Sequence, residues 1–402
     1  MFARIASLAV VSFVVAGVVT AAPWPSCGRV SGVPGASWAE TDPAALGWSA
    51  AKLAEAKAVF AAQPSAAVVV VHQGRLVAQW GSVGKRYTAQ SVRKALVNSL
   101  VGMLVDQRRL RPSDTLATLG IDDREPALTD NEKRATLQDL LRSRSGIFHS
   151  ALYEVGGWKK ERMALAEEER RAGRDLYPAG AYWIYNNWDF NAVGTVLERT
   201  AKREIGPLFA EWVARPLQME DFRPEDVEYT TSDHPAEKRF GNVSDHRAYV
   251  FNISTRDLAR YGLLYLGCGR WNGRQIVSEA WIRESLTGVN TSIGRPADRQ
   301  RTGFGDYGYL WQIDRPGARR FEMLETREPY YIASGARGHA MLVMPYLDLV
   351  IAHQVATEGG VGMEAQLRRA TQGSPEVTDE QFQKLVAAII AAHPAGVTAF
   401  AN

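Results

Sequence analysis

The sequence contains few cysteines and little net charge, and each shortage excludes a class of protein. Among its 402 residues, Cys27 and Cys268 are the two cysteines, too few for a disulfide scaffold or a structural zinc site. They either pair in an oxidising compartment or remain free thiols, and the sequence leaves both alternatives open. The formal net charge is +3, and no basic stripe is interleaved with aromatic residues, so we expect no nucleic-acid partner.

Motifs of several enzyme classes are missing as well. The seven histidines form no recognisable Ser-His-Asp pattern. The chain has neither a Gly-x-Ser-x-Gly elbow nor a His-Glu-x-x-His zinc motif, and it shows no phosphate-binding loop. The sequence therefore implies no cofactor and no metal. A nucleophile in this protein would need a base other than histidine.

Long apolar runs are confined to the N-terminus. Arg4 is followed by an uncharged segment that ends in the small residues of Val19-Thr20-Ala21. This pattern predicts a secretory signal peptide over residues 1–21, cut near Ala21 or Ala22, with an uncleaved anchor as the alternative. No later run is long enough to span a bilayer. We therefore expect an exported protein, periplasmic or extracellular, without a transmembrane segment after signal removal.

Strand-like runs lie near both ends of the chain, with helical patterns between them. The first, at 66–81, is a hairpin candidate with a turn at Gln73-Gly74. Strand-like runs return at 307–314, 328–335 and 339–355, and the last of these is also expected to be a hairpin. This order predicts an α+β fold, in which an antiparallel sheet is built from the N- and C-terminal segments and flanked by helices.

The same patterns predict a division into domains. Residues 22–48, rich in Pro, Gly, Ala and Ser, are expected to form an extended N-terminal lead-in. Residues 49–115 plus 246–402 are expected to form the sheet domain, and residues 116–245 an inserted, mainly helical domain.

A serine and a lysine three positions apart carry the strongest chemical signal. Ser91–Lys94 (SVRK) opens an apolar-periodic, helical segment. Positions i and i+3 share one face of a helix, so the Lys94 amine can reach the Ser91 hydroxyl and take its proton. In a first helical turn, the Ser91 N–H is also free to donate to an oxyanion. Two further Ser-x-x-Lys matches, at Ser49 and Ser82, are interpreted as a helix cap and a turn.

Two more blocks supply groups that such a pair would need. Tyr185 can relay a proton to a leaving group, and Asn187 can orient Lys94 and a substrate carbonyl, whereas Trp183 and Trp188 are expected in the core.

Later in the chain, the small residues Ser334 and Gly335 end a strand and would let a substrate approach the backbone. The Ala336 N–H is the candidate for a second oxyanion donor. The alternative interpretation of this block is an ordinary glycine-rich turn.

Taken together, these blocks resemble the serine β-lactamase and penicillin-binding protein superfamily, in particular its class C-like esterase and amidase branch, which includes nylon-oligomer hydrolases. The resemblance covers most of residues 50–390. Beside the SVRK segment, it includes YNNWDFNAVGTVLE (185–198) and SGARGHAMLVMP (334–345). It implies a β-lactamase/transpeptidase-like fold, with Ser91 as nucleophile, Lys94 as base and Tyr185 as proton relay.

One departure from that superfamily bears on the substrate. Its penicillin-binding proteins and true β-lactamases usually carry Lys-Thr/Ser-Gly where this chain has Ala333-Ser334-Gly335. The lysine that helps hold a substrate carboxylate is therefore missing. This puts specificity for β-lactams and for D-Ala-D-Ala in doubt.

The sequence thus predicts a secreted serine hydrolase that cleaves a small ester, amide or peptide through a Ser91 acyl-enzyme. Two alternatives stay open. One is a D-amino-acid peptidase or weak β-lactamase acting on peptidoglycan-like substrates. The other is a non-catalytic binding or sensor module on a hydrolase fold. The oligomeric state is not predicted.

Overall fold

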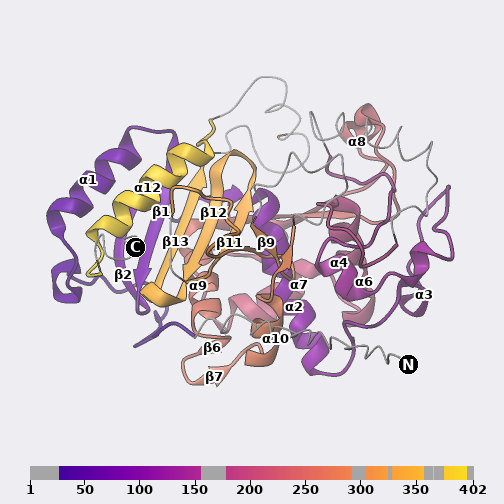
Figure 1. Ribbon diagram of the computed structural model, residues 1–402, viewed down its shortest axis with the longest axis horizontal. Helices are drawn as coiled ribbons and strands as arrows, with labels where there is room; N and C mark the ends of the chain where they lie inside the picture. The colour runs from indigo at the N-terminus through magenta and orange to yellow at the C-terminus, as the bar shows by residue number, and fades with distance from the viewer. Residues whose placement is uncertain are drawn as a thin grey trace, which may run out of the picture.

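The computed structural model describes residues 27–154, 178–291, 305–324, 328–356, 365 and 375–395 (Figure 1). The predicted signal peptide over residues 1–21 lies outside the described residues. The largest element is an eight-stranded sheet in the order β2-β1-β13-β12-β11-β10-β9-β8. Its strands are β1 (Ser65–His72), β2 (Arg75–Gly81), β8 (Val289–Asn290), β9 (Asp306–Tyr307), β10 (Gln312–Asp314), β11 (Tyr330–Gly335), β12 (His339–Met344) and β13 (Leu349–Val355).

Strands from the N-terminal and C-terminal parts of the chain pair with each other in this sheet. Strand β1 pairs antiparallel with β13, from Ser65 opposite Val355 to His72 opposite Leu349. The predicted hairpins β1–β2 and β12–β13 are both present. The predicted fold class is therefore confirmed: an antiparallel sheet built from N- and C-terminal segments and flanked by helices.

The predicted strand over residues 307–314 is instead a hairpin. Strand β9 ends at Tyr307 and β10 begins at Gln312, and these two residues pair with each other. Leu310 has a positive φ of 64° between them, and the Gly308 N–H donates to the Trp311 carbonyl at 2.9 Å. The apolar residues of the turn are buried, so their hydropathy mimics that of a continuous strand.

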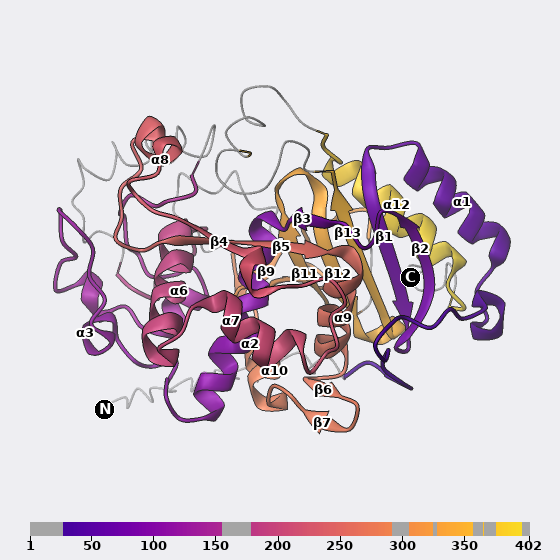
Figure 2. The ribbon, with the colours of Figure 1, turned by 180° about the vertical axis from the view of Figure 1, so that it is seen from behind.

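Helices cover both faces of the sheet. Helices α1 (Ala50–Ala61) and α12 (Asp379–Ala392) lie side by side on one face, and α2 (Arg93–Asp106) and α9 (Thr255–Leu266) lie behind the other (Figures 1 and 2). Strand β1 shows why its sequence is apolar without alternation. Val68 and Val70 pack toward α1 and α12, whereas Val69 and Val71 pack toward α2 and α9, because successive side chains point to opposite faces.

Short helices and turns fill most of the region between α2 and α9, and another helix follows α9. These are α3 (Leu116–Leu119), α4 (Leu137–Leu141), α6 (Asn187–Ala201), α7 (Ile205–Phe209), α8 (Pro235–Phe240) and α10 (Glu279–Ser285). Trp183 and Trp188 are buried there, as expected from the sequence.

A second sheet was not predicted from the sequence. It has three strands, in the order β3 (Arg86–Thr88), β5 (Ala248–Ser254) and β4 (Val227–Thr230). Strands β3 and β4 have three and four residues, too few for a period of two to stand out. The Ala89 N–H, just after β3, donates to the Phe251 carbonyl at 2.8 Å. This sheet therefore holds the chain in place immediately before Ser91.

Cys27 and Cys268 form a disulfide across a sequence separation of 241 residues. The sequence left open whether these two cysteines pair or remain free thiols; in the structure they are paired. The Gly28 N–H also donates to the Leu266 carbonyl at 3.0 Å, so the described start of the chain is fixed to the end of α9. A cross-link over so long a loop restricts the unfolded chain and thereby stabilises the fold.

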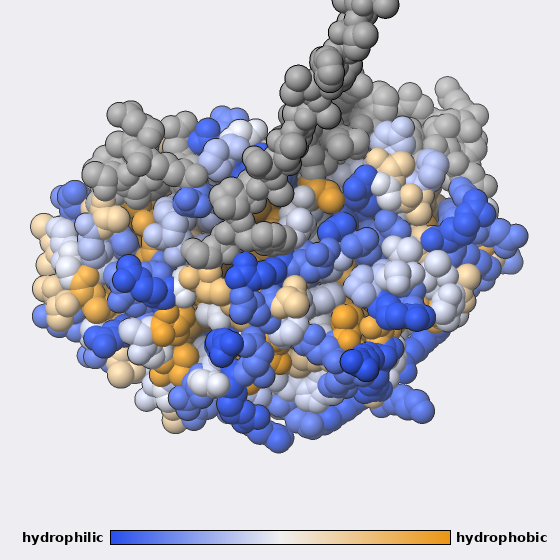
Figure 3. Space-filling model, turned by 60° about the horizontal axis from the view of Figure 1, so that its bottom comes forward, coloured by the Kyte–Doolittle hydropathy of each residue, from blue (hydrophilic) through white to orange (hydrophobic). Residues whose placement is uncertain are grey.

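The surface is mainly polar. On the face shown in Figure 3, apolar residues are scattered among hydrophilic ones. In the described part of the chain, Val243 and Met323 are the large hydrophobic residues that are exposed. Within the same residues, no helix combines the length and the apolar character that crossing a membrane would require.

Candidate active site

Ser91 lies in a tight turn between β3 and α2. The turn is a 3-10 helix over Gln90–Val92, and α2 begins at Arg93. Gln90 is buried and has a positive φ of 51°, a conformation that costs energy for a residue with a side chain and that is frequent at functional sites. Ser91 itself is half-buried, so the residue stays partly accessible to solvent.

The Lys94 amine joins the Ser91 hydroxyl to the Tyr185 phenol. Its Nζ lies 2.8 Å from Ser91 Oγ and 2.5 Å from Tyr185 Oη. Ser91 and Lys94 come from the turn and the first residues of α2, whereas Tyr185 precedes α6. The structure thus brings together three side chains that the sequence singled out from two separate segments.

Burial favours the neutral form of the Lys94 amine over the protonated form. The residue is 3% exposed, and its Nζ lies 4.7 Å from the ring centroids of both Tyr185 and Phe190. Burial lowers the pKa of Lys94 well below its usual range; Arg93 lowers it further, and Glu154 opposes the shift. The shift favours the neutral amine, which is the form that can accept a proton.

The Tyr185 phenol is held in its neutral form. Burial raises the pKa of Tyr185, while a hydrogen bond with Ser91 and the charges of Arg93 and Arg320 partly oppose that rise. A neutral phenol beside a neutral amine can both donate and accept a proton, as a relay requires.

The two asparagines after Tyr185 have different positions. Asn186 caps α6: its Oδ1 accepts from the Trp188 N–H at 3.1 Å, and its Nδ2 donates to Asp189 at 2.9 Å. The Asn187 amide donates instead to Glu154 Oε1 at 3.4 Å. The sequence predicted that Asn187 orients Lys94; in the structure, the Asn187 amide is hydrogen-bonded to Glu154, whose charge raises the pKa of Lys94.

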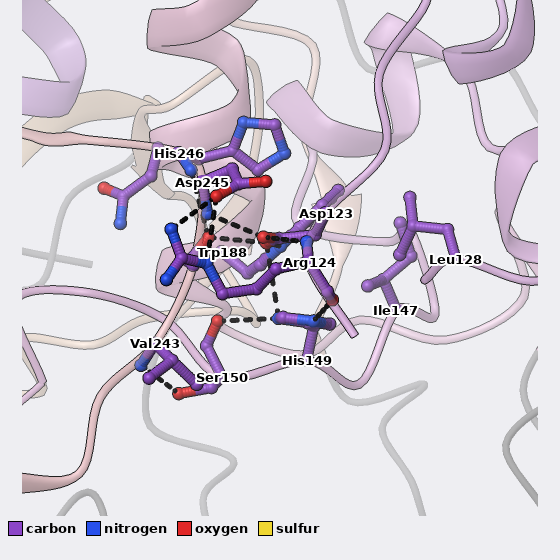
Figure 4. A network of polar contacts seen from close by, with 12 residues as sticks. Asp123, Arg124, Leu128, Ile147, His149, Ser150, Trp188, Val243, Asp245 and His246 are labelled. Carbon is purple, nitrogen blue, oxygen red and sulfur yellow. Dashed lines mark hydrogen bonds and ion pairs between the residues drawn. The ribbon is translucent and has the colours of Figure 1, made fainter. Parts of the chain in front are cut away.

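A buried polar network fixes the base of α6 beside the site (Figure 4). The Asp123 carboxylate accepts from Trp188 Nε1 at 2.7 Å and from the Asp245 N–H at 2.6 Å, and it lies 3.3 Å from His149 Nδ1. Burial alone would raise the pKa of Asp123, but hydrogen bonds from Ser244, Asp245 and Trp188 hold it below its usual range. The ionised carboxylate thus anchors Trp188, three residues after Tyr185.

The end of β11 lies against the turn that carries Ser91. A Cβ on Gly335 would lie 2.8 Å from the Ala89 carbonyl oxygen and 2.9 Å from Gln90 Cβ, so only glycine fits there without a shift. Ala336, the next residue, is exposed. The strand therefore runs close enough to Ser91 for its backbone to take part in the same site.

The Ser334 hydroxyl already makes two hydrogen bonds within the protein. It donates to Gln312 Oε1 at 2.8 Å and accepts from Arg320, which is in turn paired with Asp379 at 3.2 Å. Ala333, which the resemblance drawn from the sequence places opposite a lysine, is buried.

Comparison with known proteins places this chain in a family. A model of the beta-lactamase family matches residues 53–372. The chain belongs to the beta-lactamase family. Ser91, Lys94 and Tyr185 all lie within the matched range. No protein with a curated description matches the chain by sequence.

Solved structures resemble this beta-lactamase-family chain at low identity. A Bacillus anthracis protein, provisionally described as a 6-aminohexanoate-dimer hydrolase, has a TM-score of 0.56 at 18% identity, covering 84% of this chain and 81% of its own. A provisional beta-lactamase from Bacteroides dorei has a TM-score of 0.57 at 16% identity, covering 85% and 99%. A penicillin-binding protein homologue from Caulobacter crescentus has a TM-score of 0.51 at 15% identity, covering 76% and 91%. These likenesses show the fold.

Three charged residues of this beta-lactamase-family site were missed from the sequence. The charges of Arg93 and Glu154 shift the pKa of Lys94, and those of Arg93 and Arg320 shift the pKa of Tyr185. Arg93 lies inside the SVRK motif, whereas Glu154 and Arg320 lie outside the quoted motifs. The position of Arg93 inside SVRK was the available signal, because a charged residue next to a buried lysine can shift the pKa of that lysine. Glu154 and Arg320 are distant in sequence, and only the fold brings them near.

Proposed function

We propose that this protein is an exported serine hydrolase that cleaves a small ester or amide through an acyl-enzyme on Ser91. The carrying observation is the buried Lys94 amine, within hydrogen-bond distance of both Ser91 Oγ and Tyr185 Oη. Such an arrangement activates a serine without histidine. In this proposal, residues 49–115 plus 246–402 form the sheet domain that supplies Ser91 and Lys94. Residues 116–245 form the helical domain that supplies Tyr185.

The reaction has two steps. In the first, neutral Lys94 takes the hydroxyl proton as Ser91 Oγ attacks the carbonyl carbon, and the N–H groups of Ser91 and Ala336 stabilise the oxyanion. The proton passes from Lys94 through Tyr185 to the leaving oxygen or nitrogen, and the acyl group stays on Ser91. In the second, water attacks the carbonyl carbon of the ester and passes one proton through Tyr185 to Lys94. The bond between that carbon and Ser91 Oγ then breaks, Lys94 returns the proton to Oγ, and the acid is released.

The surroundings of Ser334 favour substrates without a carboxylate at that point. Ala333 supplies no charge, and the Arg320 guanidinium is already paired with Asp379. Ser334 and Gly335 are proposed to line the acyl group through their backbone and small side chains. Export is supported by the N-terminal sequence and by the disulfide, since disulfides persist in oxidising compartments.

A substrate panel tests this function. The purified mature protein is assayed with p-nitrophenyl butyrate, a linear dimer of 6-aminohexanoate, a chromogenic cephalosporin and a peptide ending in D-Ala-D-Ala. We expect the ester or the linear amide to be hydrolysed fastest. Faster turnover of the cephalosporin or the peptide would replace this assignment with a β-lactamase or a D-amino-acid peptidase. No turnover, together with no labelling by a fluorophosphonate, would favour a non-catalytic binding module.

A further inference from the structure

Arg93 is a fully buried arginine beside the lysine of the site. It is 0% exposed and occupies the first position of α2, directly before Lys94. Its guanidinium carbon lies 4.5 Å from the ring centroid of Tyr249 and 5.5 Å from that of Tyr153. Aromatic faces attract a cation, so the rings hold the guanidinium in place without neutralising it.

Among the residues that the structure describes, none offers Arg93 a carboxylate partner. Its hydrogen bond is from Nη2 to Asn191 Oδ1, at 3.3 Å. Within the described residues, its Nε and Nη1 have no hydrogen-bond partner, and no ion pair includes it. Arg260 shows the contrast: it is equally buried but pairs with Glu220 at 2.9 Å.

An arrangement of this kind is costly for folding. An unpaired buried charge loses its hydration without recovering a Coulomb interaction, and an apolar residue of similar size is usually tolerated better. Arginine cannot avoid that cost by losing a proton, whereas a buried lysine can. Of the two adjacent cations, Lys94 is therefore the one that discharges.

We propose that Arg93 is a positioning residue whose fixed charge, added to the effect of burial, keeps the neighbouring Lys94 amine unprotonated, ready to take the Ser91 proton. This inference rests on the proposed function and adds a regulator of the base. Arg93 acts on Lys94 without touching the substrate.

Other charged and titratable groups also act on Arg93, on Lys94 or on their neighbours. Glu154 opposes Arg93 by favouring the charged amine. Burial raises the pKa of three nearby phenols, and the charge of Arg93 partly lowers each of them. These are the phenols of Tyr185, Tyr249 and Tyr307. Asp189 acts on Tyr307 as well. Because the burial of these phenols keeps them neutral, Lys94 is the group whose titration limits the rate on the acidic side.

The test is the pH profile of kcat/KM for a p-nitrophenyl ester, with Arg93→Met, Arg93→Gln and Asn191→Ala beside the wild type. Loss of the guanidinium should move the acidic limb of the profile upward by about 1 pH unit or more. The rate at neutral pH should then fall about tenfold per unit and recover at alkaline pH. Arg93→Gln retains a polar group for Asn191. If Arg93→Met does not fold, the position of the acidic limb is read from Arg93→Gln instead. Asn191→Ala removes the hydrogen bond but keeps the charge, so its acidic limb should stay in place.

The outcomes separate this inference from the proposed function. A Ser91-dependent reaction whose acidic limb is unmoved in the folded Arg93 variants would overturn the inference alone. An equal shift in Asn191→Ala would also overturn it, because packing and not charge would then be responsible. Equal rates for the wild type and Ser91→Ala would overturn the proposed function, and this inference with it.

Discussion

Replacing Ser91 with alanine is expected to lower the rate of p-nitrophenyl ester hydrolysis by about three orders of magnitude or more. The alanine lacks the oxygen that attacks the carbonyl, so no acyl-enzyme can form, and Lys94 and Tyr185 lose the group whose proton they transfer. Ser91 is half-buried at a turn that β3 and β5 hold in place, and loss of one hydroxyl leaves that turn intact. The kcat of the purified variant measures the effect.

The chain offers a matched control in Ser82, which also precedes a lysine by three residues. Ser82 and Lys85 are exposed after β2, without the burial that changes the charge of Lys94. Ser82→Ala should therefore keep nearly the full rate. If Ser82→Ala and Ser91→Ala lost activity to the same extent, the loss could not be assigned to a nucleophile at Ser91.

Replacing Lys94 with methionine is expected to lower kcat by about two to four orders of magnitude. Methionine has a similar length and is apolar, so it can occupy the space between Tyr185 and Phe190, but it cannot take a proton. The residual rate should also lose its acidic limb, because the group that titrates is gone. Initial rates between pH 5 and pH 10, about the range over which a shifted lysine titrates, measure both effects.

Lys85→Met is the control for this change, since it removes an exposed lysine from the same sequence pattern. Thermal unfolding of each variant shows whether the fold is kept. Near-full activity of a folded Lys94→Met protein would exclude Lys94 as the base and leave Tyr185 to fill that role.

The fold was predictable where the pattern is strong and local. The run at 66–72 and the turn at Gln73-Gly74 mark the first hairpin, and a sheet built from both ends of the chain follows from the placement of the strand-like runs. The small sheet was missed because β3 has three residues and its pairing with β5 spans more than a hundred positions. Turns with buried apolar residues, such as that at Leu310, imitate strands.

The site was predictable where one short motif carries several groups. Ser91 and Lys94 share a helical face, and Tyr185 belongs to a distinct block, so all three could be named. Which of Asn186 and Asn187 caps α6 depends on the residue at which that helix begins. Sequence patterns locate such boundaries poorly. The burial of Arg93 depends on Tyr249 and Tyr153, which only tertiary packing brings to it. A charged residue at that position is expected on the surface from sequence alone.

The most direct test of the central claim is to locate the acyl group on the protein. The mature wild type is mixed briefly with a p-nitrophenyl ester, quenched in acid, digested and mapped by mass spectrometry, with Ser91→Ala and Ser82→Ala treated in parallel. We predict one acylated peptide, modified at Ser91, in the wild type and in Ser82→Ala, and none in Ser91→Ala. Acylation at another residue, or an active enzyme whose Ser91 never carries the acyl group, even when a fluorophosphonate is used in place of the ester, would contradict the account.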